Sequence, residues 1–129
     1  MKIESLEAHP TLLLLLAFNR DEYFDRDTYP AAFWEELPDL LAGRDKERGG
    51  TWLGITRTGR FALLTNIRVA PSEFRKDTLS RGLLTTAFLT GSTPPLEYLQ
   101  NISVQDYNGF NLVVGDLRKQ QHRSLQMQP

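Results

Sequence analysis

The chain has 129 residues, with 15 lysine and arginine side chains against 16 aspartate and glutamate, and a formal net charge of −1 at pH 7. This length suits one domain with its own core, and the near-neutral charge excludes a domain-wide basic surface for nucleic acid. Because the chain has no cysteine, disulfides, thiolate metal sites and a thiol nucleophile are excluded. Its two histidines, His9 and His122, lie far apart, so we expect no metal site and no cofactor.

The first strongly apolar segment covers residues 12–18. It is too short to span a bilayer, and acidic residues precede it where a signal peptide would be positively charged. We therefore expect no transmembrane segment. Residues 11–18 instead predict a strand that is covered on both faces, preceded by a weak first strand or an irregular end.

A polar and charged segment follows this strand, with the sequence NRDE at residues 19–22. Arg20 can hold a carboxylate or phosphate through paired hydrogen bonds, and Asp21 can orient a neighbouring donor. The alternative is that these side chains pair with Arg26 or Arg44 and close a loop. The ligand-binding candidates here are Asn19, Arg20, Asp21 and Glu22, and Arg20 and Asp21 are also catalytic candidates.

The next segments lead towards a glycine pair. We expect residues 27–30 to form a loop, residues 31–36 a helical turn that stops before Pro38, residues 39–42 a short strand and residues 43–48 a polar turn.

Residues 49–66, with the sequence GGTWLGITRTGRFALLTN, predict a β-hairpin that belongs to a larger sheet. The turn falls at Thr58 and Gly59. The paired glycines allow another backbone or a ligand to come close, although ordinary turn formation is the alternative. The side-chain amide of Asn66 can donate to an oxyanion, which makes it a catalytic candidate, unless it only caps a turn. The ligand-binding candidates of this region are Arg44, Gly49, Gly50, Thr51 and Trp52.

The second half of the chain predicts two helices before a final strand. We expect a surface loop over residues 69–78, a helix over residues 81–89 capped by Ser80, a short helix that starts at Pro95, and a strand over residues 110–114.

Two asparagines of this half, Asn108 and Asn111, are further ligand-binding candidates, although a tight turn explains Asn108 and Gly109 without any function. Residues 118–129 are basic and glutamine-rich, with little to bury, and predict a disordered tail. The order of elements predicts an α+β fold with helices on one face of a mainly antiparallel sheet.

Six blocks of sequence occur in a recognisable order and spacing. They are NRDE at 19–22 followed by Arg26, FW at 33–34, LAGRD at 41–45, GGTWLG at 49–54, LTN at 64–66 and YNGFNLVVGDL at 107–117. Together they resemble the NRDE family, whose animal members are called transport and Golgi organisation 2 homologues. The resemblance implies that residues 1–117 form the N-terminal half of the family domain, so that the layered fold is incomplete.

The family in turn resembles N-terminal nucleophile hydrolases, which have layered αββα sheets and a cysteine directly after the initiator methionine. On this resemblance, Arg20 and Asp21 match positions near the nucleophile, and Asn66 matches an amide on the oxyanion side. This chain carries Lys2 at the position of that cysteine, and an exposed lysine stays protonated at pH 7. We therefore expect a non-catalytic protein, with an amide-bond hydrolase as the disfavoured alternative.

The resemblance also implies roles in Golgi organisation, protein secretion and the handling of haem or lipid. It implies a cytoplasmic protein associated with the Golgi apparatus or mitochondria, with a small-molecule, lipid or haem partner. Another interpretation is a half-domain without independent function, whose exposed sheet face would self-associate.

Overall fold

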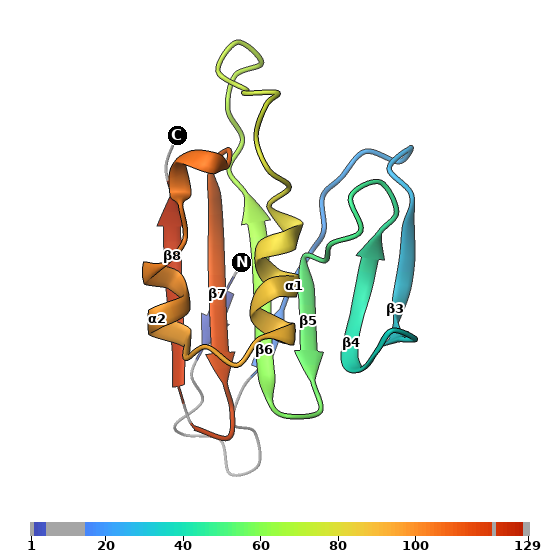
Figure 1. The fold of residues 1–129 in the computed structure, drawn as a ribbon. Helices are drawn as coiled ribbons and strands as arrows, with labels where there is room; N and C mark the ends of the chain where they lie inside the picture. The colour runs from blue at the N-terminus through green and yellow to red at the C-terminus, as the bar shows by residue number, and fades with distance from the viewer. Residues whose placement is uncertain (1, 5–14, 120, 128–129) are drawn as a thin grey trace.

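The structure is a computed structural model that describes residues 2–4, 15–119 and 121–127. Its main element is a six-stranded antiparallel sheet with the strands in the order β3-β4-β5-β6-β7-β8 (Figure 1). A separate two-stranded sheet pairs β1 (Lys2–Glu4) with β2 (Leu15–Ala17). The six strands of the main sheet are β3 (Thr28–Trp34), β4 (Leu37–Asp45), β5 (Leu53–Thr56), β6 (Arg60–Asn66), β7 (Phe110–Asp116) and β8 (Gln121–Met127).

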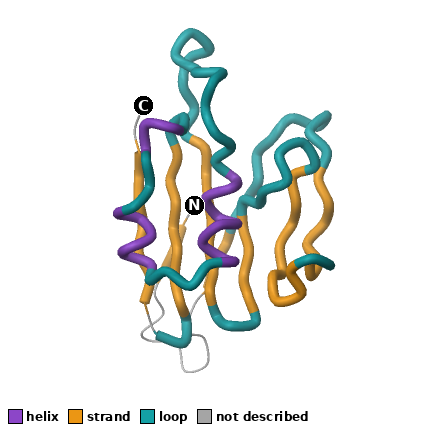
Figure 2. Tube along the Cα trace, viewed as in Figure 1, coloured by secondary structure: helices purple, strands orange, loops and turns teal. Residues whose placement is uncertain are grey.

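Two helices cover one face of the main sheet, as Figure 2 shows. They are α1 (Gly82–Thr90) and α2 (Pro95–Gln100), and a 3-10 turn (Val104–Asp106) follows them. Phe88 of α1 is fully buried and makes an edge-to-face contact with Tyr98 of α2, with ring centroids 5.2 Å apart. The core beneath the helices consists of Trp34, Leu40, Ala42, Ala62, Leu64, Leu84, Phe88, Leu89, Leu99, Phe110, Leu112 and Val114. The predicted α+β class and mainly antiparallel sheet are confirmed.

The other face of the sheet carries a second, smaller core. Successive side chains of a strand point to opposite faces, so Phe61 and Leu63 of β6 lie away from the helices. They form a cluster with Val113, and Leu16 and Phe18 pack against it. The two-stranded sheet therefore lies on the side opposite the helices, where the blue strands of Figure 1 run behind β6 and β7.

Most of the predicted elements after residue 38 are confirmed. The hairpin is β5 and β6, and Gly59 at its turn has a φ of 89°. The loop over residues 69–78, both helices and the strand that begins at Phe110 are also present. The predicted Ser80 cap is wrong, because Arg81 is the N-cap residue and no side chain caps the helix.

The predicted helical turn over residues 31–36 is wrong, because this segment lies in β3 and the following turn. Ala32 pairs with Ala42 and Phe33 with Leu41, and the Trp34 indole N–H donates to the Ala42 carbonyl at 3.1 Å. Pairing with β4 therefore outweighs the local helical tendency. The predicted loop and polar turn on either side are shorter than expected, since β3 already begins at Thr28 and β4 continues to Asp45.

The prediction of a disordered tail is also wrong for residues 121–127, which form β8. This strand pairs with the whole of β7, from Phe110 opposite Met127 to Asp116 opposite Gln121. It is an edge strand with few apolar residues, and Leu125 packs on the helix-side core.

The apolar segment 11–18 is a strand over its described part, but it is not covered on both faces. Leu16 packs inward, whereas Leu15 is 54% exposed. Residues 11–14 lie outside the described residues. No helix in the part of the chain that the structure describes is long and apolar enough to cross a membrane.

Candidate functional site

Several of the sequence blocks meet at one end of the main sheet. Strands β4 and β6 end there, at Asp45 and Asn66, while β5 and β7 begin there. The N-terminus of α1 reaches the same end, at the top of the sheet in Figure 1. Antiparallel pairing thus gathers residues that are far apart in the sequence, and we refer to this region as the upper sheet end.

Two of the blocks meet directly at Arg20 and Trp52. The guanidinium carbon of Arg20 lies 4.6 Å from the centre of the Trp52 ring, which is a cation–π contact. The indole also packs so closely on Gly43 that a Cβ there would lie 2.7 Å from Trp52 Cζ2. The absence of a side chain at Gly43 therefore leaves room for the Trp52 ring. Arg20 in turn packs on that ring.

The glycine pair combines both uses considered for it, since Gly49 makes a turn and Gly50 allows a close backbone approach, in which the partner is α1. A Cβ on Gly50 would lie 2.5 Å from the carbonyl carbon of Gly82, so only glycine fits. The Thr51 N–H donates to the Gly82 carbonyl at 3.3 Å, and the Thr85 hydroxyl donates to the Thr51 carbonyl. Gly49, at a φ of 74°, makes the turn that leads into this contact.

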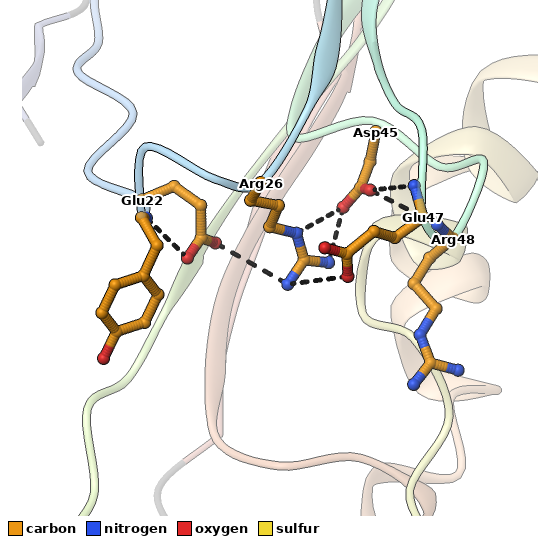
Figure 3. Close-up of polar contacts among 6 residues, drawn as sticks. Glu22, Arg26, Asp45, Glu47 and Arg48 are labelled. Atoms are coloured by element: carbon orange, nitrogen blue, oxygen red, sulfur yellow. Dashed lines mark hydrogen bonds and ion pairs between the residues drawn. The ribbon is translucent and has the colours of Figure 1, made fainter.

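A group of charged side chains lies beside this contact (Figure 3). Arg26 donates to Asp45 Oδ2 from Nε at 2.9 Å and from Nη2 at 2.6 Å. Asp45 Oδ1 accepts the backbone N–H groups of Glu47 at 2.8 Å and Arg48 at 3.3 Å. Arg26 Nη1 also lies 4.0 Å from carboxylate oxygens of Glu22 and Glu47. Asp45 therefore fixes both the turn after β4 and the loop that carries Arg26.

The environment of Asp45 shifts its pKa. Burial alone would raise the pKa, but the hydrogen bonds from Arg26 and from the backbone of Glu47, together with the charge of Arg26, outweigh burial and hold it below its ordinary value. The carboxylate is thus stabilised in its charged form by the same contacts that fix the loop.

Arg81 is a further residue of this region that we did not identify from the sequence. Its Nη1 donates to the Gly109 carbonyl at 2.8 Å. Burial and the charge of Arg26 lower the pKa of Arg81, and the charge of Glu22 opposes them. A cation at a helix N-terminus is electrostatically unfavourable, and this mismatch is the signal that could have identified it.

The remaining candidates do not join this group in one pocket. Arg44 stacks on Trp34, with its guanidinium carbon 4.4 Å from the ring centre, and also pairs with Glu36. Thr51 is 1% exposed, and its hydroxyl donates to the Leu53 carbonyl at 3.0 Å. The exposed candidates at or near the upper sheet end are Asn19, Asp21 and Asn66.

Asn108 and Asn111 make structural contacts. The buried Asn108 side chain accepts the Arg75 N–H at 3.1 Å and donates to the Arg75 carbonyl at 2.8 Å and to Thr78 Oγ1 at 2.9 Å. It therefore fastens the loop over residues 69–78 to the sheet. Asn111 donates to the Thr65 hydroxyl oxygen at 3.0 Å. Within the described ranges, no group of three or more histidine, aspartate or glutamate residues is arranged to hold a metal ion.

Asp45→Asn should lower the free energy of unfolding by about 1–3 kcal/mol at pH 7, because the charge-assisted bonds from Arg26 are lost. A carboxyl whose folded pKa is depressed stabilises the fold above its unfolded pKa, near 4, and loses this effect as pH falls through the folded pKa. The difference in the free energy of unfolding between the unchanged chain and the Asp45→Asn variant should therefore shrink below about pH 4. Urea unfolding at several pH values measures it.

Asp39→Asn is the control for this experiment, because the Asp39 side chain is 67% exposed and lies 3.9 Å from Arg57. It should change stability little at any pH. An Asp45→Asn variant as stable as the unchanged chain at pH 7 would contradict the structural role of Asp45.

Comparison with known proteins extends these observations. The family model for Transport and Golgi organisation 2 matches residues 2–128. The human Transport and Golgi organization protein 2 homolog is 42% identical over 109 residues, which cover 81% of this chain and 39% of the relative. The Drosophila melanogaster Transport and Golgi organization protein 2 is 32% identical over 111 residues, covering 78% and 38%.

An uncharacterized protein of Saccharomyces cerevisiae is 31% identical over an alignment 131 positions long, which covers 90% of this chain and 42% of the relative. The chain spans about two fifths of the length of the curated relatives that it matches. Because the family model matches almost the whole chain, the resemblance found in its sequence blocks is confirmed, and the chain belongs to the Transport and Golgi organisation 2 family.

Proposed function

We propose that this chain is a non-catalytic family member that binds an anionic small molecule at the upper sheet end. The observation that carries the proposal is the contact between Arg20 and Trp52, which joins two sequence blocks at the surface of the domain. A guanidinium that rests on an aromatic ring still carries N–H donors, which suit a carboxylate or phosphate. The indole adds an apolar surface for the rest of the ligand.

The residue type at position 2 supports a non-catalytic role. Lys2 pairs with Ala17, the last residue of β2. Arg20 and Asp21 follow Ala17 by three and four residues, so position 2 lies next to the segment that carries them. This is the arrangement that the resemblance to N-terminal nucleophile hydrolases implies for the nucleophile. The position holds lysine, and the sequence has no cysteine. The site therefore has binding groups without the nucleophile of that mechanism.

The layering of the domain fits the same resemblance. Helices, the six-stranded sheet and the small sheet of β1 and β2 form three successive layers. We propose that these layers correspond to an incomplete αββα arrangement of the N-terminal nucleophile type, in which the small sheet is part of the second β layer.

The family resemblance suggests haem or a lipid as the ligand, since haem propionates and fatty acids both combine a carboxylate with a large apolar body. The names of the human and insect relatives refer to transport and Golgi organisation. We accordingly propose a role in Golgi organisation and protein secretion, in the cytoplasm and in association with the Golgi apparatus or mitochondria.

Haemin and palmitate test the ligand proposal directly. Haemin should shift its Soret band when the chain is added, and palmitate should compete with it or quench tryptophan fluorescence. Arg20→Ala should weaken binding about tenfold or more, because a charge-assisted hydrogen bond is lost.

Arg118→Ala is the matched control, since Arg118 is an exposed arginine that follows β7 at the other end of the sheet. It should bind as tightly as the unchanged chain. Failure of both ligands to bind, or equal affinity in the Arg20→Ala variant, would show that the proposal is wrong.

The register of Lys2 also supports an alternative function, an amide-bond hydrolase of the N-terminal nucleophile type. The unchanged chain should not hydrolyse a panel of acyl-amides, whereas Lys2→Cys should introduce turnover if Arg20, Asp21 and Asn66 form a competent site. Adding Asp21→Ala should abolish that turnover, and adding Asp25→Ala, at an exposed aspartate of the same loop, should leave it.

Hydrolysis by the unchanged chain would overturn the non-catalytic proposal and favour the enzyme. A Lys2→Cys variant that folds but hydrolyses none of the acyl-amides would exclude the alternative.

A further inference from the structure

An apolar row crosses three strands on the face of the sheet opposite the helices. The register places Phe33 of β3 opposite Leu41 of β4, Leu41 opposite Ile55 of β5, and Ile55 opposite Phe61. Directly opposed residues point to the same face, and Phe61 belongs to the core on that face. Phe33, Leu41 and Ile55 therefore extend this core sideways, and we call them the β3–β5 row.

The β3–β5 row is open to solvent. Phe33 is 45% exposed and Ile55 is 40% exposed, and Leu41 is partly buried. Leu16 and Phe18 cover the neighbouring cluster of Phe61, Leu63 and Val113, which does not include the row. An apolar surface that continues a core and has a polar border is typical of an interaction site.

The border of the row carries one charge of each sign. The guanidinium carbon of Arg57 lies 4.0 Å from the centre of the Phe33 ring, and Arg57 Nε lies 3.9 Å from Asp39 Oδ1. Both charged side chains are mostly exposed, at 60% for Arg57 and 67% for Asp39. Aromatic residues and arginine are enriched at protein interfaces, where they contribute most of the binding energy.

We propose that a second copy of this chain docks on the β3–β5 row, sheet face against sheet face. A two-fold axis brings the same surface of both copies together. The row then packs on itself, as the inner faces of two sheets do in a sandwich. The charges beside the row are complementary between two copies, because Arg57 of one copy can pair with Asp39 of the other.

This dimer surface goes beyond the proposed ligand site and uses none of its residues, although Trp52 packs on Gly43, which lies two residues from Leu41 on the same face of β4. Phe33 lies near the end of β3, whereas the upper sheet end lies at its start, next to Arg26. Failure of ligand binding and failure of dimerisation are therefore separate outcomes.

Sedimentation equilibrium of the full chain over a range of micromolar concentrations tests the proposal. The chain should form a dimer, and Ile55→Lys should raise the dimer dissociation constant at least tenfold, because it places a charge in the apolar row. Leu96→Lys is the matched control, since Leu96 is 51% exposed on α2, on the other face. It should leave the dissociation constant unchanged.

A second pair of variants keeps the test decisive if Ile55→Lys does not fold by circular dichroism. Arg57→Glu should weaken the dimer through repulsion by Asp39, and the combined Arg57→Glu and Asp39→Arg exchange should restore it. A chain that stays monomeric over the whole range would overturn the proposal. So would a dimer whose affinity neither Ile55→Lys nor Arg57→Glu changes.

Discussion

The contact between Gly50 and Gly82 is the constraint on which the upper sheet end depends. It brings the backbone before β5 against the first turn of α1, and a Cβ on Gly50 would lie 2.5 Å from the Gly82 carbonyl carbon. The Thr51 N–H and the Thr85 hydroxyl add hydrogen bonds across the same contact. Because Trp52 follows directly, the helix and the sheet together determine where its ring, and with it Arg20, comes to lie.

Three glycines of this chain's sequence blocks have structural reasons near this contact. Gly43 makes room for the Trp52 ring, Gly49 provides the left-handed turn and Gly50 allows the helix to approach. Asp45 then fastens the adjoining turn and the loop that carries Arg26. These residues support the contact between Arg20 and Trp52, so most of this region serves to position a small number of side chains.

The sequence predicted the elements that are set by neighbouring residues. The predictions were wrong where pairing with a strand far away in the sequence determines the secondary structure. The hairpin of β5 and β6 and the two helices follow from turn residues and apolar spacing. Residues 31–34 and 121–127 are strands because β4 and β7 pair with them. At the site, the blocks identified Arg20 and Trp52, but not their contact. Arg81 was missed, and the structural role of Asn108 depends on a loop some thirty residues away.

The free energy of unfolding of Gly50→Ala, measured by urea denaturation, tests whether the upper sheet end depends on the close contact between Gly50 and Gly82. Overpacking against a backbone that cannot move aside should lower it by about 1–3 kcal/mol or more. The added methyl group should also disturb the environment of Trp52, visible as a changed fluorescence spectrum of the folded variant. A Gly50→Ala variant whose stability lies within about 0.5 kcal/mol of the unchanged chain would contradict the account.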